Sequence, residues 1–153
     1  MKKNFLPISI DISTSKILII GGGLSALKKV KILLRSNANI DVLAESFIDE
    51  ILDLKVVRIQ KAYEKSDFKG YLMLFSCTDD DVVDRQIAED GRESGVLVNV
   101  HDKPELCQFV SPAIYRDGDI SVAVSSNGEN VHEAIRLRNV IQDYLENLKA
   151  NKI

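Results

Sequence analysis

The chain has 153 residues, of which 45% are hydrophobic and 28% are charged, so it can form one folded domain with at most a small appendage, and wholesale disorder is excluded. Its 20 basic and 23 acidic side chains give a net charge of −3, which excludes the basic excess that nucleic-acid and anionic-membrane binders use. The two cysteines lie outside any C-x-x-C pattern, and the sequence has neither a secretory signal nor a membrane-spanning run. We therefore expect a cytoplasmic protein.

The first part of the chain predicts a βαβ unit. Residues 16–20 are apolar without alternation, which is typical of a strand buried on both faces of a parallel sheet. Three glycines follow, and then a helical pattern with its apolar residues on one side and its lysines, Lys29 among them, on the other. Residues 39–44 predict a second strand, which completes the unit.

Strands and helices continue to alternate as far as residue 100. The pattern predicts a short helix over 47–54, a strand over 56–59, a connection over 63–70, a strand over 71–76, a helix from Asp80 or Asp81 to Glu93, and a strand over 96–100. This alternation predicts an α/β fold with a Rossmann-like, doubly wound parallel sheet, and we expect the strand order 3-2-1-4-5.

After His101 the pattern changes to strands without intervening helices. We expect strands over 109–113 and 120–125, joined through 115–119, and then a helix from about residue 129 to 149. The apolar arc of this helix is broader than one small neighbour can cover. We therefore expect the helix and an exposed strand edge to pack against a second chain.

The segment 21–26 fits the dinucleotide pattern G-x-G-x-x-G/A, directly after a strand and at the start of a helix. Gly21 permits a sharp turn, Gly23 leaves no Cβ between the backbone and a pyrophosphate, and Ala26 lets the helix lie close to the strand. The helix start would receive the anion. The alternative is a structural glycine turn that binds nothing, and the context favours the dinucleotide.

An acidic residue follows the second predicted strand at the expected place. Glu45 lies 22 residues after Gly23, at the spacing of the acid that binds a ribose 2′-hydroxyl. The alternative is a solvated loop carboxylate, and Asp41, inside the strand, is the poorer candidate. No basic residue follows Glu45 until Lys55, which favours NAD over NADP.

Polar residues Thr78 to Asp81 follow the fourth predicted strand. The carboxyl ends of parallel strands face the ligand in such sheets. These residues are expected to cap the next helix, to contact the cofactor, or to do both.

Together these motifs resemble the NAD-dependent dehydrogenase domain of siroheme synthase, also called precorrin-2 dehydrogenase/sirohydrochlorin ferrochelatase. The resemblance covers roughly residues 5–145, and the part from Asn99 to Gly128 makes it specific. The matching segments are Leu6-Pro7-Ile8, residues 17–23, residues 77–81, residues 99–102, residues 109–113, residues 116–120 and residues 122–128.

The resemblance implies oxidation of precorrin-2 to sirohydrochlorin with NAD, and for some members the insertion of ferrous iron. It implies an NAD-binding Rossmann domain over residues 1–112 and a dimerisation domain of a strand and a long helix over residues 113–150. It also implies an intertwined homodimer with the tetrapyrrole substrate in a cleft between domains. The family's usual C-terminal helical extension is absent from these 153 residues. Neither nucleic acid, membrane nor a standing metal site is expected.

By the same resemblance Asp102 is the catalytic aspartate, a general base that would take the proton released as the ring system is oxidised. The alternative is a carboxylate that caps the loop before Pro104. The expected cofactor-binding residues are Gly21, Gly22, Gly23, Leu24, Ser25, Glu45, Ser46, Thr78 and Asp79, and the expected substrate-binding residues are Ser126, Asn127 and Arg138.

A second hypothesis is an NAD-sensing regulatory Rossmann module, of the kind that gates potassium transport, without catalysis. Such a module shares the glycine turn and the two acidic positions. It would close its sheet with further βα units after Val100, whereas this sequence predicts a strand pair and one long helix.

Overall fold

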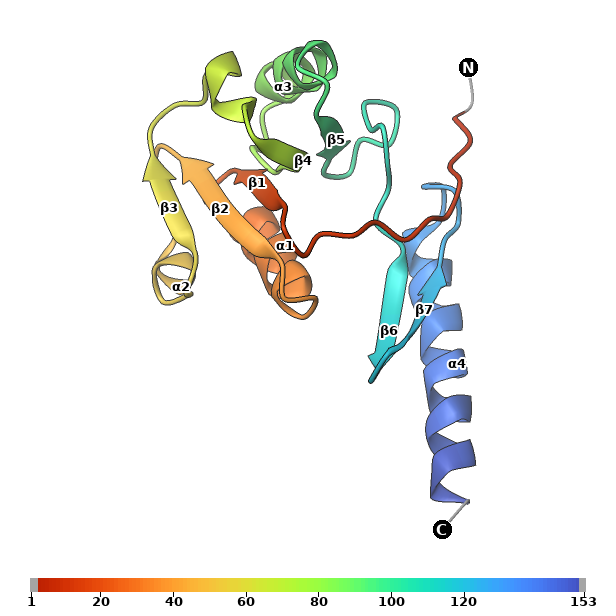
Figure 1. Cartoon of the computed structure of the whole chain (residues 1–153). Coiled ribbons are helices and arrows are strands. Elements are labelled where there is room, and N and C mark those ends of the chain that lie inside the picture. Colours follow the sequence, from red (N-terminus) through yellow and green to blue (C-terminus); the bar gives the residue numbers. More distant parts are fainter. Residues whose placement is uncertain (1–2, 152–153) are drawn as a thin grey trace. The chain divides into compact units, whose positions relative to one another are not determined.

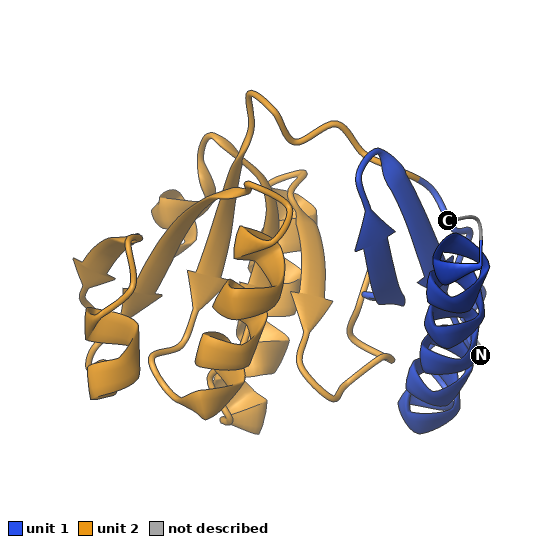
Figure 2. Cartoon of the chain, turned by 90° about the horizontal axis from the view of Figure 1, so that it is seen from below, with its two compact units in different colours: residues 1–8, 110–153 blue, residues 9–109 orange. Residues whose placement is uncertain are grey.

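The computed structural model describes residues 3–151, which divide into two compact units (Figure 2). We call residues 9–109 the sheet unit, and the described residues on either side, 3–8 and 110–151, the hairpin unit. That these units work as an NAD-binding domain and a dimerisation domain stays a prediction.

The sheet unit alternates strands and helices, as the sequence predicted (Figure 1). Its five strands are all parallel and lie in the order β3-β2-β1-β4-β5, which confirms the predicted topology. The elements are β1 (Lys16–Ile20), α1 (Leu24–Leu34), β2 (Asn39–Ala44), α2 (Asp49–Leu52), β3 (Val57–Gln60), the 3-10 turn η1 (Lys65–Phe68), β4 (Tyr71–Ser76), α3 (Asp81–Glu93) and β5 (Leu97–Val100).

Helices cover both faces of this sheet. On one face Ala26, Leu27 and Val30 of α1 belong to a buried cluster with Ile19 of β1 and Phe75 of β4. Successive side chains of a strand point to opposite faces, so the neighbours of these strand residues line the other face. There α3 packs so closely that a Cβ on its Gly91 would lie 2.3 Å from Val98 Cγ2.

Strand register places the ends of the central strands level with one another. Ile20 of β1 pairs with Leu43 of β2 and with Ser76 of β4, and Ser76 pairs with Val100 of β5. The loops that begin at Gly21, Glu45, Cys77 and His101 therefore leave the sheet at the same carboxyl edge.

The hairpin unit consists of the antiparallel strands β6 (Ala113–Asp117) and β7 (Ile120–Val124) and the 20-residue helix α4 (Val131–Ala150). Gly118, with a φ of +57°, and Asp119 form the two-residue turn between the strands. Asn130 caps α4, because its side chain accepts a hydrogen bond from the backbone N–H of Glu133 at 3.0 Å.

The strand predicted over 109–113 is wrong. The first strand of the hairpin begins at Ala113, and residues 115–117, predicted as part of a long connection, belong to it. The tight turn at Gly118 explains the shift, because a two-residue turn leaves no room for a longer connection. Phe109 instead anchors the sheet unit, where its ring meets the Phe75 ring edge-on at 5.3 Å between centroids.

Smaller differences concern the ends of elements. The helix expected over 47–54 is only Asp49–Leu52, β3 begins one residue later than expected, and the connection over 63–70 contains η1. Among the described helices none is both long enough and apolar enough to span a membrane.

Candidate functional site

The turn between β1 and α1 accepts only glycine at its first two positions. Gly21 has a φ of +130°, and a Cβ there would lie 2.1 Å from the carbonyl oxygen of Cys77. A Cβ on Gly22 would lie 1.8 Å from the carbonyl oxygen of Ser46. Both glycines are thus required for the ends of β1, β2 and β4 to pack together, whatever the turn binds.

Gly23 is different, because no atom of the described chain outside its own neighbours lies within 4 Å of a Cβ built on it. It is the N-cap residue of α1, which therefore has no side-chain cap, and the first turn carries no acidic residue. The first N–H groups of a helix have no partner within it, and they carry partial positive charge. An open, uncapped start of this kind fits the pyrophosphate of the predicted cofactor.

Two loops meet beside this helix start. The hydroxyl of Ser25, in the first turn of α1, lies 3.4 Å from Oδ1 of Asp79, in the loop between β4 and α3. Asp79 holds a left-handed backbone with a φ of +60°, and it is exposed. Leu24 is exposed too, at 62%. The structure thus brings three of the predicted cofactor-binding residues together.

Asp80, not Thr78, caps the N-terminus of α3. The Asp80 carboxylate accepts hydrogen bonds from the backbone N–H groups of Val82 at 2.8 Å and Val83 at 3.1 Å. The Thr78 hydroxyl donates to Oδ1 of Asp84 at 2.8 Å. Contact between Thr78 and the cofactor stays a prediction.

Glu45 and Ser46 are exposed at the end of β2, on the carboxyl edge. The side-chain amide of Gln60, at the end of the adjacent β3, donates to the Glu45 carbonyl oxygen at 3.2 Å. Lys61 follows β3, but its ammonium pairs with Asp67 at 2.9 Å. Binding of a ribose by the Glu45 carboxylate stays a prediction.

Asp102 also lies at this edge, two residues after β5. Its backbone is left-handed, with a φ of +56°, and its side chain is 86% exposed. The preceding His101 donates its backbone N–H to the Ser76 carbonyl oxygen at 2.9 Å, and its ring Nε2 lies 3.4 Å from the Asp102 carboxylate. A carboxylate presented in this way can accept a proton from a bound substrate. Among the described residues, no group of three or more His, Cys, Asp or Glu side chains is arranged to hold a metal ion.

The sequence analysis misplaced Lys29. Its ammonium lies 4.6 Å from the centroid of the Phe75 ring, on the side of α1 that faces the sheet. Burial lowers its pKa, and the nearby groups Cys77, Cys107 and Asp102 oppose that shift. Burial also raises the pKa of the Cys77 thiol to about 12, so this cysteine stays neutral at ordinary pH and is no nucleophile.

The sequence analysis also missed Asp84, which is only 2% exposed in α3. A signal was present, because Asp84 precedes the buried Ile87 and Ala88 by three and four residues, so it lies on the same inward face. A carboxylate at such a position must have partners within the protein.

The predicted substrate-binding residues lie in the hairpin unit, where each has a structural contact. The Ser126 hydroxyl accepts the backbone N–H of Asn130 at 3.0 Å. The Asn127 side chain accepts from the N–H of Phe5 at 2.7 Å and donates to the carbonyl oxygen of Lys3 at 2.8 Å, so it fixes the N-terminal segment. Arg138 donates to the Ile114 carbonyl oxygen at 3.2 Å. Their contact with substrate stays a prediction.

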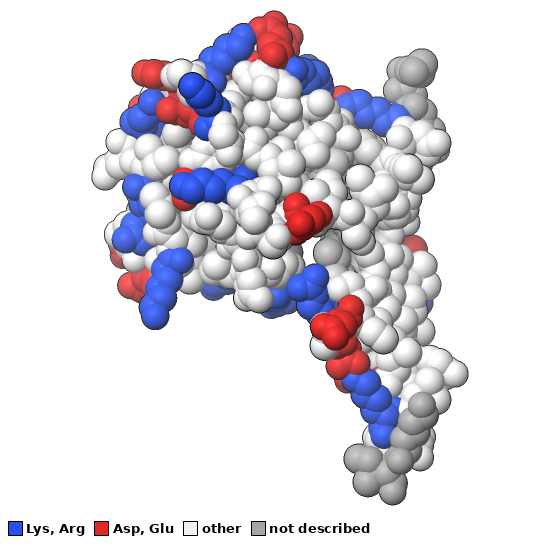
Figure 3. Space-filling model, viewed as in Figure 1, with Lys and Arg blue, Asp and Glu red and all other residues white. Residues whose placement is uncertain are grey.

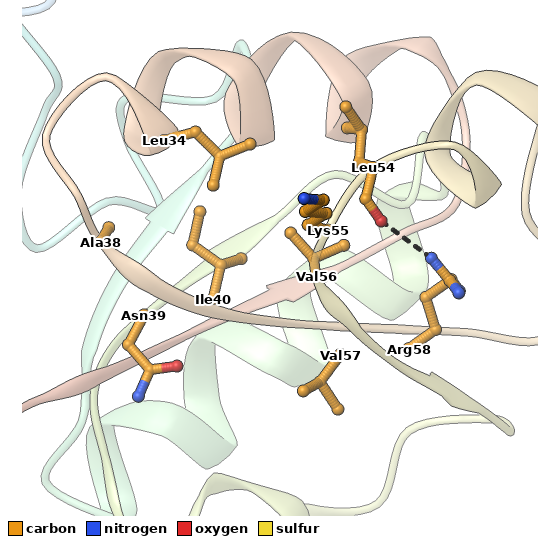
Figure 4. A pocket seen from close by; sticks show the side chains of 9 residues that line it. All are labelled: Leu34, Ala38, Asn39, Ile40, Leu54, Lys55, Val56, Val57 and Arg58. Carbon is orange, nitrogen blue, oxygen red and sulfur yellow. Dashed lines mark hydrogen bonds between the residues drawn. The ribbon is translucent and has the colours of Figure 1, made fainter.

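Two hollows of the sheet unit lie at its opposite, amino edge. One, of about 520 Å³, lies where β2 and β3 begin, and Leu34, Ile40 and Val56 line it together with Arg58 (Figure 4). Arg58 donates there to the Leu54 carbonyl oxygen at 3.0 Å. The other, of about 390 Å³, lies where β4 and β5 begin. Ligands of parallel sheets bind at the carboxyl edge, so neither hollow is the candidate site.

Comparisons with known proteins indicate the family and the fold of the chain. A family model described as putative NAD(P)-binding matches residues 8–113. The siroheme synthase of Methylococcus capsulatus is 36% identical over 143 residues, which cover 91% of this chain and 30% of the relative. The siroheme synthase of Ruthia magnifica subsp. Calyptogena magnifica is 34% identical over 130 residues, which cover 82% of this chain and 28% of the relative.

The chain thus spans less than a third of the length of these relatives. A solved structure of SirC, precorrin-2 dehydrogenase, superposes with a TM-score of 0.76 and 21% identity, over 92% of this chain and 70% of that chain. At this identity the likeness establishes a common fold.

Proposed function

The chain belongs to the putative NAD(P)-binding family, and from this premise we propose that it binds NAD and oxidises precorrin-2 to sirohydrochlorin. The siroheme synthases to which it is similar, and the precorrin-2 dehydrogenase whose fold it shares, support this reaction. One observation carries the proposal: the open start of α1 and the exposed carboxylate of Asp102 lie on the same edge of the sheet.

The residues at this edge fit the cofactor. The N–H groups at the start of α1, from Leu24 and Ser25, would bind the pyrophosphate, and the missing Cβ of Gly23 leaves it room. Glu45 would accept the ribose hydroxyls, and a carboxylate at this place disfavours a 2′-phosphate, so NAD is preferred to NADP. When bound, NAD supplies the acceptor for a hydride.

Asp102 is the general base of the proposed reaction. Oxidation of the tetrapyrrole transfers a hydride to the cofactor and releases a proton, which the Asp102 carboxylate takes up. Its exposure allows a large substrate to reach it. Ser126, Asn127 and Arg138 are proposed to bind the substrate's own carboxylates, for which the Arg138 guanidinium is the best suited donor. The proposal covers dehydrogenation alone, and a cytoplasmic location remains a prediction.

The part of the chain after β5 favours an enzyme over a sensor module. In the described residues β5 is followed by the β6–β7 hairpin and α4, not by further βα units that would extend the sheet. This arrangement agrees with the dehydrogenase hypothesis. The described residues lack the further βα units that the sensor hypothesis expects.

A homodimer is part of the proposal. Leu137, Val140, Tyr144 and Leu148 recur at helical spacing along α4 and are 39%, 53%, 63% and 43% exposed within the chain. Much of the surface along α4 is uncharged in Figure 3. A contiguous apolar stripe of this kind is typical of an interface, and a second copy of this chain is the proposed occupant.

Sedimentation equilibrium tests the dimer. We expect the wild-type chain to sediment as a dimer, Val140→Asp as a monomer, and Asn139→Asp, which adds the same charge beside the stripe, as a dimer. A wild-type monomer at micromolar concentration would contradict this part of the proposal.

The reaction itself is tested by absorbance. The chain is mixed with NAD and enzymatically made precorrin-2 without oxygen, and sirohydrochlorin is followed against a control without protein. We expect product to appear faster with the chain and only when NAD is present. Tight binding of NAD without faster product would leave a binding module and refute the dehydrogenase.

A further inference from the structure

Asp84 of α3 is a buried carboxylate whose two oxygens are both engaged. Oδ1 accepts hydrogen bonds from the hydroxyl of Ser76 at 2.5 Å and of Thr78 at 2.8 Å. Oδ2 lies 2.5 Å from the ammonium of Lys103. The Asp84 side chain is only 3% exposed, so it requires these donors, because a buried carboxylate without partners is strongly unfavourable.

Lys103 reaches Asp84 from the loop after β5. It directly follows Asp102 in the chain, and its ammonium also lies 2.6 Å from Oδ1 of Asp81, at the start of α3. Hydrogen bonds to Asp81 and Asp84 raise the pKa of Lys103, so the lysine keeps its charge. Asp81 is 78% exposed, and exposed ion pairs contribute little to stability, whereas Asp84 is buried.

Asp102 therefore lies between two anchors. On one side, the His101 backbone N–H bonds to the Ser76 carbonyl oxygen at 2.9 Å. On the other side, Lys103 is fixed to α3 through Asp84. Between them Asp102 adopts its left-handed backbone, a conformation that the surrounding structure must hold in place. Ser76 takes part in both anchors, because its hydroxyl bonds to Asp84.

We propose that Asp84 and Lys103 are positioning residues, which fix the loop so that the Asp102 carboxylate meets the substrate. This inference rests on the proposed function. The pair touches neither substrate nor cofactor, and it acts on the reaction through the backbone of Asp102.

The test uses the double substitution Asp84→Asn with Lys103→Met. It removes both charges together, so no buried charge is left without a partner, and the asparagine can still accept the hydroxyls of Ser76 and Thr78. The matched control is Lys65→Met, because Lys65 pairs with Asp90 and Glu93 near the other end of α3.

We expect the double variant to bind NAD as the wild type does and to keep its KM for precorrin-2, while kcat falls about tenfold, since small displacements of a reacting group have effects of this size or larger. The single variant Lys103→Arg, which keeps both Asp84 and the positive charge, should have most of the wild-type kcat. Hydrogen exchange of backbone amides 101–106 should become faster in the double variant and stay unchanged in Lys65→Met.

An unchanged kcat in the double variant, measured beside an active wild type, would overturn the positioning role. An inactive wild type would instead refute the proposed function. If the wild type is inactive, hydrogen exchange still tests the structural part of the inference. Unchanged exchange in residues 101–106 of the double variant would show that Asp84 and Lys103 do not hold this loop.

Discussion

The two edges of the parallel sheet place different residues in the left-handed backbone region. At the amino edge, where helices lead into strands, positive φ angles fall on Asn37, Gly70 and Gly95, residue types that adopt them easily. At the carboxyl edge they fall on Gly21 and on two aspartates, Asp79 and Asp102. At the carboxyl edge, two aspartates thus occupy left-handed positions, whereas glycine or asparagine occupies the other left-handed positions of the described residues.

The two hollows described above are not part of the carboxyl edge. Cavities of about 520 and 390 Å³ lie at the amino edge. The carboxyl edge instead has an uncapped helix start and an exposed carboxylate. The comparison teaches that in this chain backbone geometry and available functional groups, rather than these two hollows, mark the candidate site.

The largest effect is expected at Asp102. Asn tolerates the same left-handed backbone, so Asp102→Asn should keep the fold and NAD binding while turnover falls at least ~100-fold through loss of the base. Stopped-flow absorbance with precorrin-2 measures this effect, and calorimetry with NAD is the control. Turnover equal to that of the wild type would remove Asp102 from the mechanism.

The glycine turn separates stability from binding. Gly23→Ala should change the unfolding temperature only slightly, because its Cβ meets open space and the only cost is that alanine is a poorer N-cap than glycine, but NAD affinity should fall about tenfold. Gly22→Ala, whose Cβ would lie 1.8 Å from the Ser46 carbonyl oxygen, should lower the free energy of unfolding by about 1–3 kcal/mol or more. Equal NAD affinity in Gly23→Ala and the wild type would argue against pyrophosphate binding at the start of α1.

At the amino edge a substitution should affect stability alone. Arg58→Ala removes donors to the carbonyl oxygens of Leu52 and Leu54 and should cost about 1 kcal/mol in urea unfolding. Turnover and NAD affinity should not change. A loss of either would mean that the larger cavity takes part in the reaction.

The smallest effect concerns two surface ion pairs, one near each end of α3. Lys103 lowers the pKa of Asp81 below its ordinary 3.8, and Lys65 lowers that of Glu93 below its ordinary 4.5. A lowered carboxyl pKa stabilises the fold at pH values above the ordinary one, and this stabilisation is lost as the pH falls through the folded-state value.

Asp81→Asn and Glu93→Gln should therefore each be slightly less stable than the wild type in urea at about pH 7, and each difference should shrink and vanish as the pH falls through the lowered pKa of that carboxyl group. A difference that persists in acid would show that these carboxylates act by something other than charge. Salt should reduce both differences at neutral pH.

Much of the sheet unit could be predicted from the sequence, because its signals are local. The apolar run ending at Ile20, the glycines after it and the helical pattern that follows are confirmed as β1, the turn and α1, and the strand order is confirmed as well. The register that brings Gly21, Cys77 and His101 to one edge follows from this topology.

Contacts between distant segments could not be predicted. Lys29 borders the apolar stripe of α1, and only the ring of Phe75, in β4, shows that it faces inward. The pairing of Asp84 with Lys103 joins residues 19 positions apart through the packing of α3 on the sheet. The hairpin was shifted because the two-residue turn at Gly118 was taken for a longer connection.

A crystal structure of the chain grown with NAD tests the central claim most directly. The account predicts a dinucleotide along the carboxyl edge, with its pyrophosphate against the backbone N–H groups of Leu24 and Ser25 and its ribose at Glu45. A dinucleotide bound in the amino-edge cavity beside Arg58, or a carboxyl edge left unbound at saturating NAD, would contradict it.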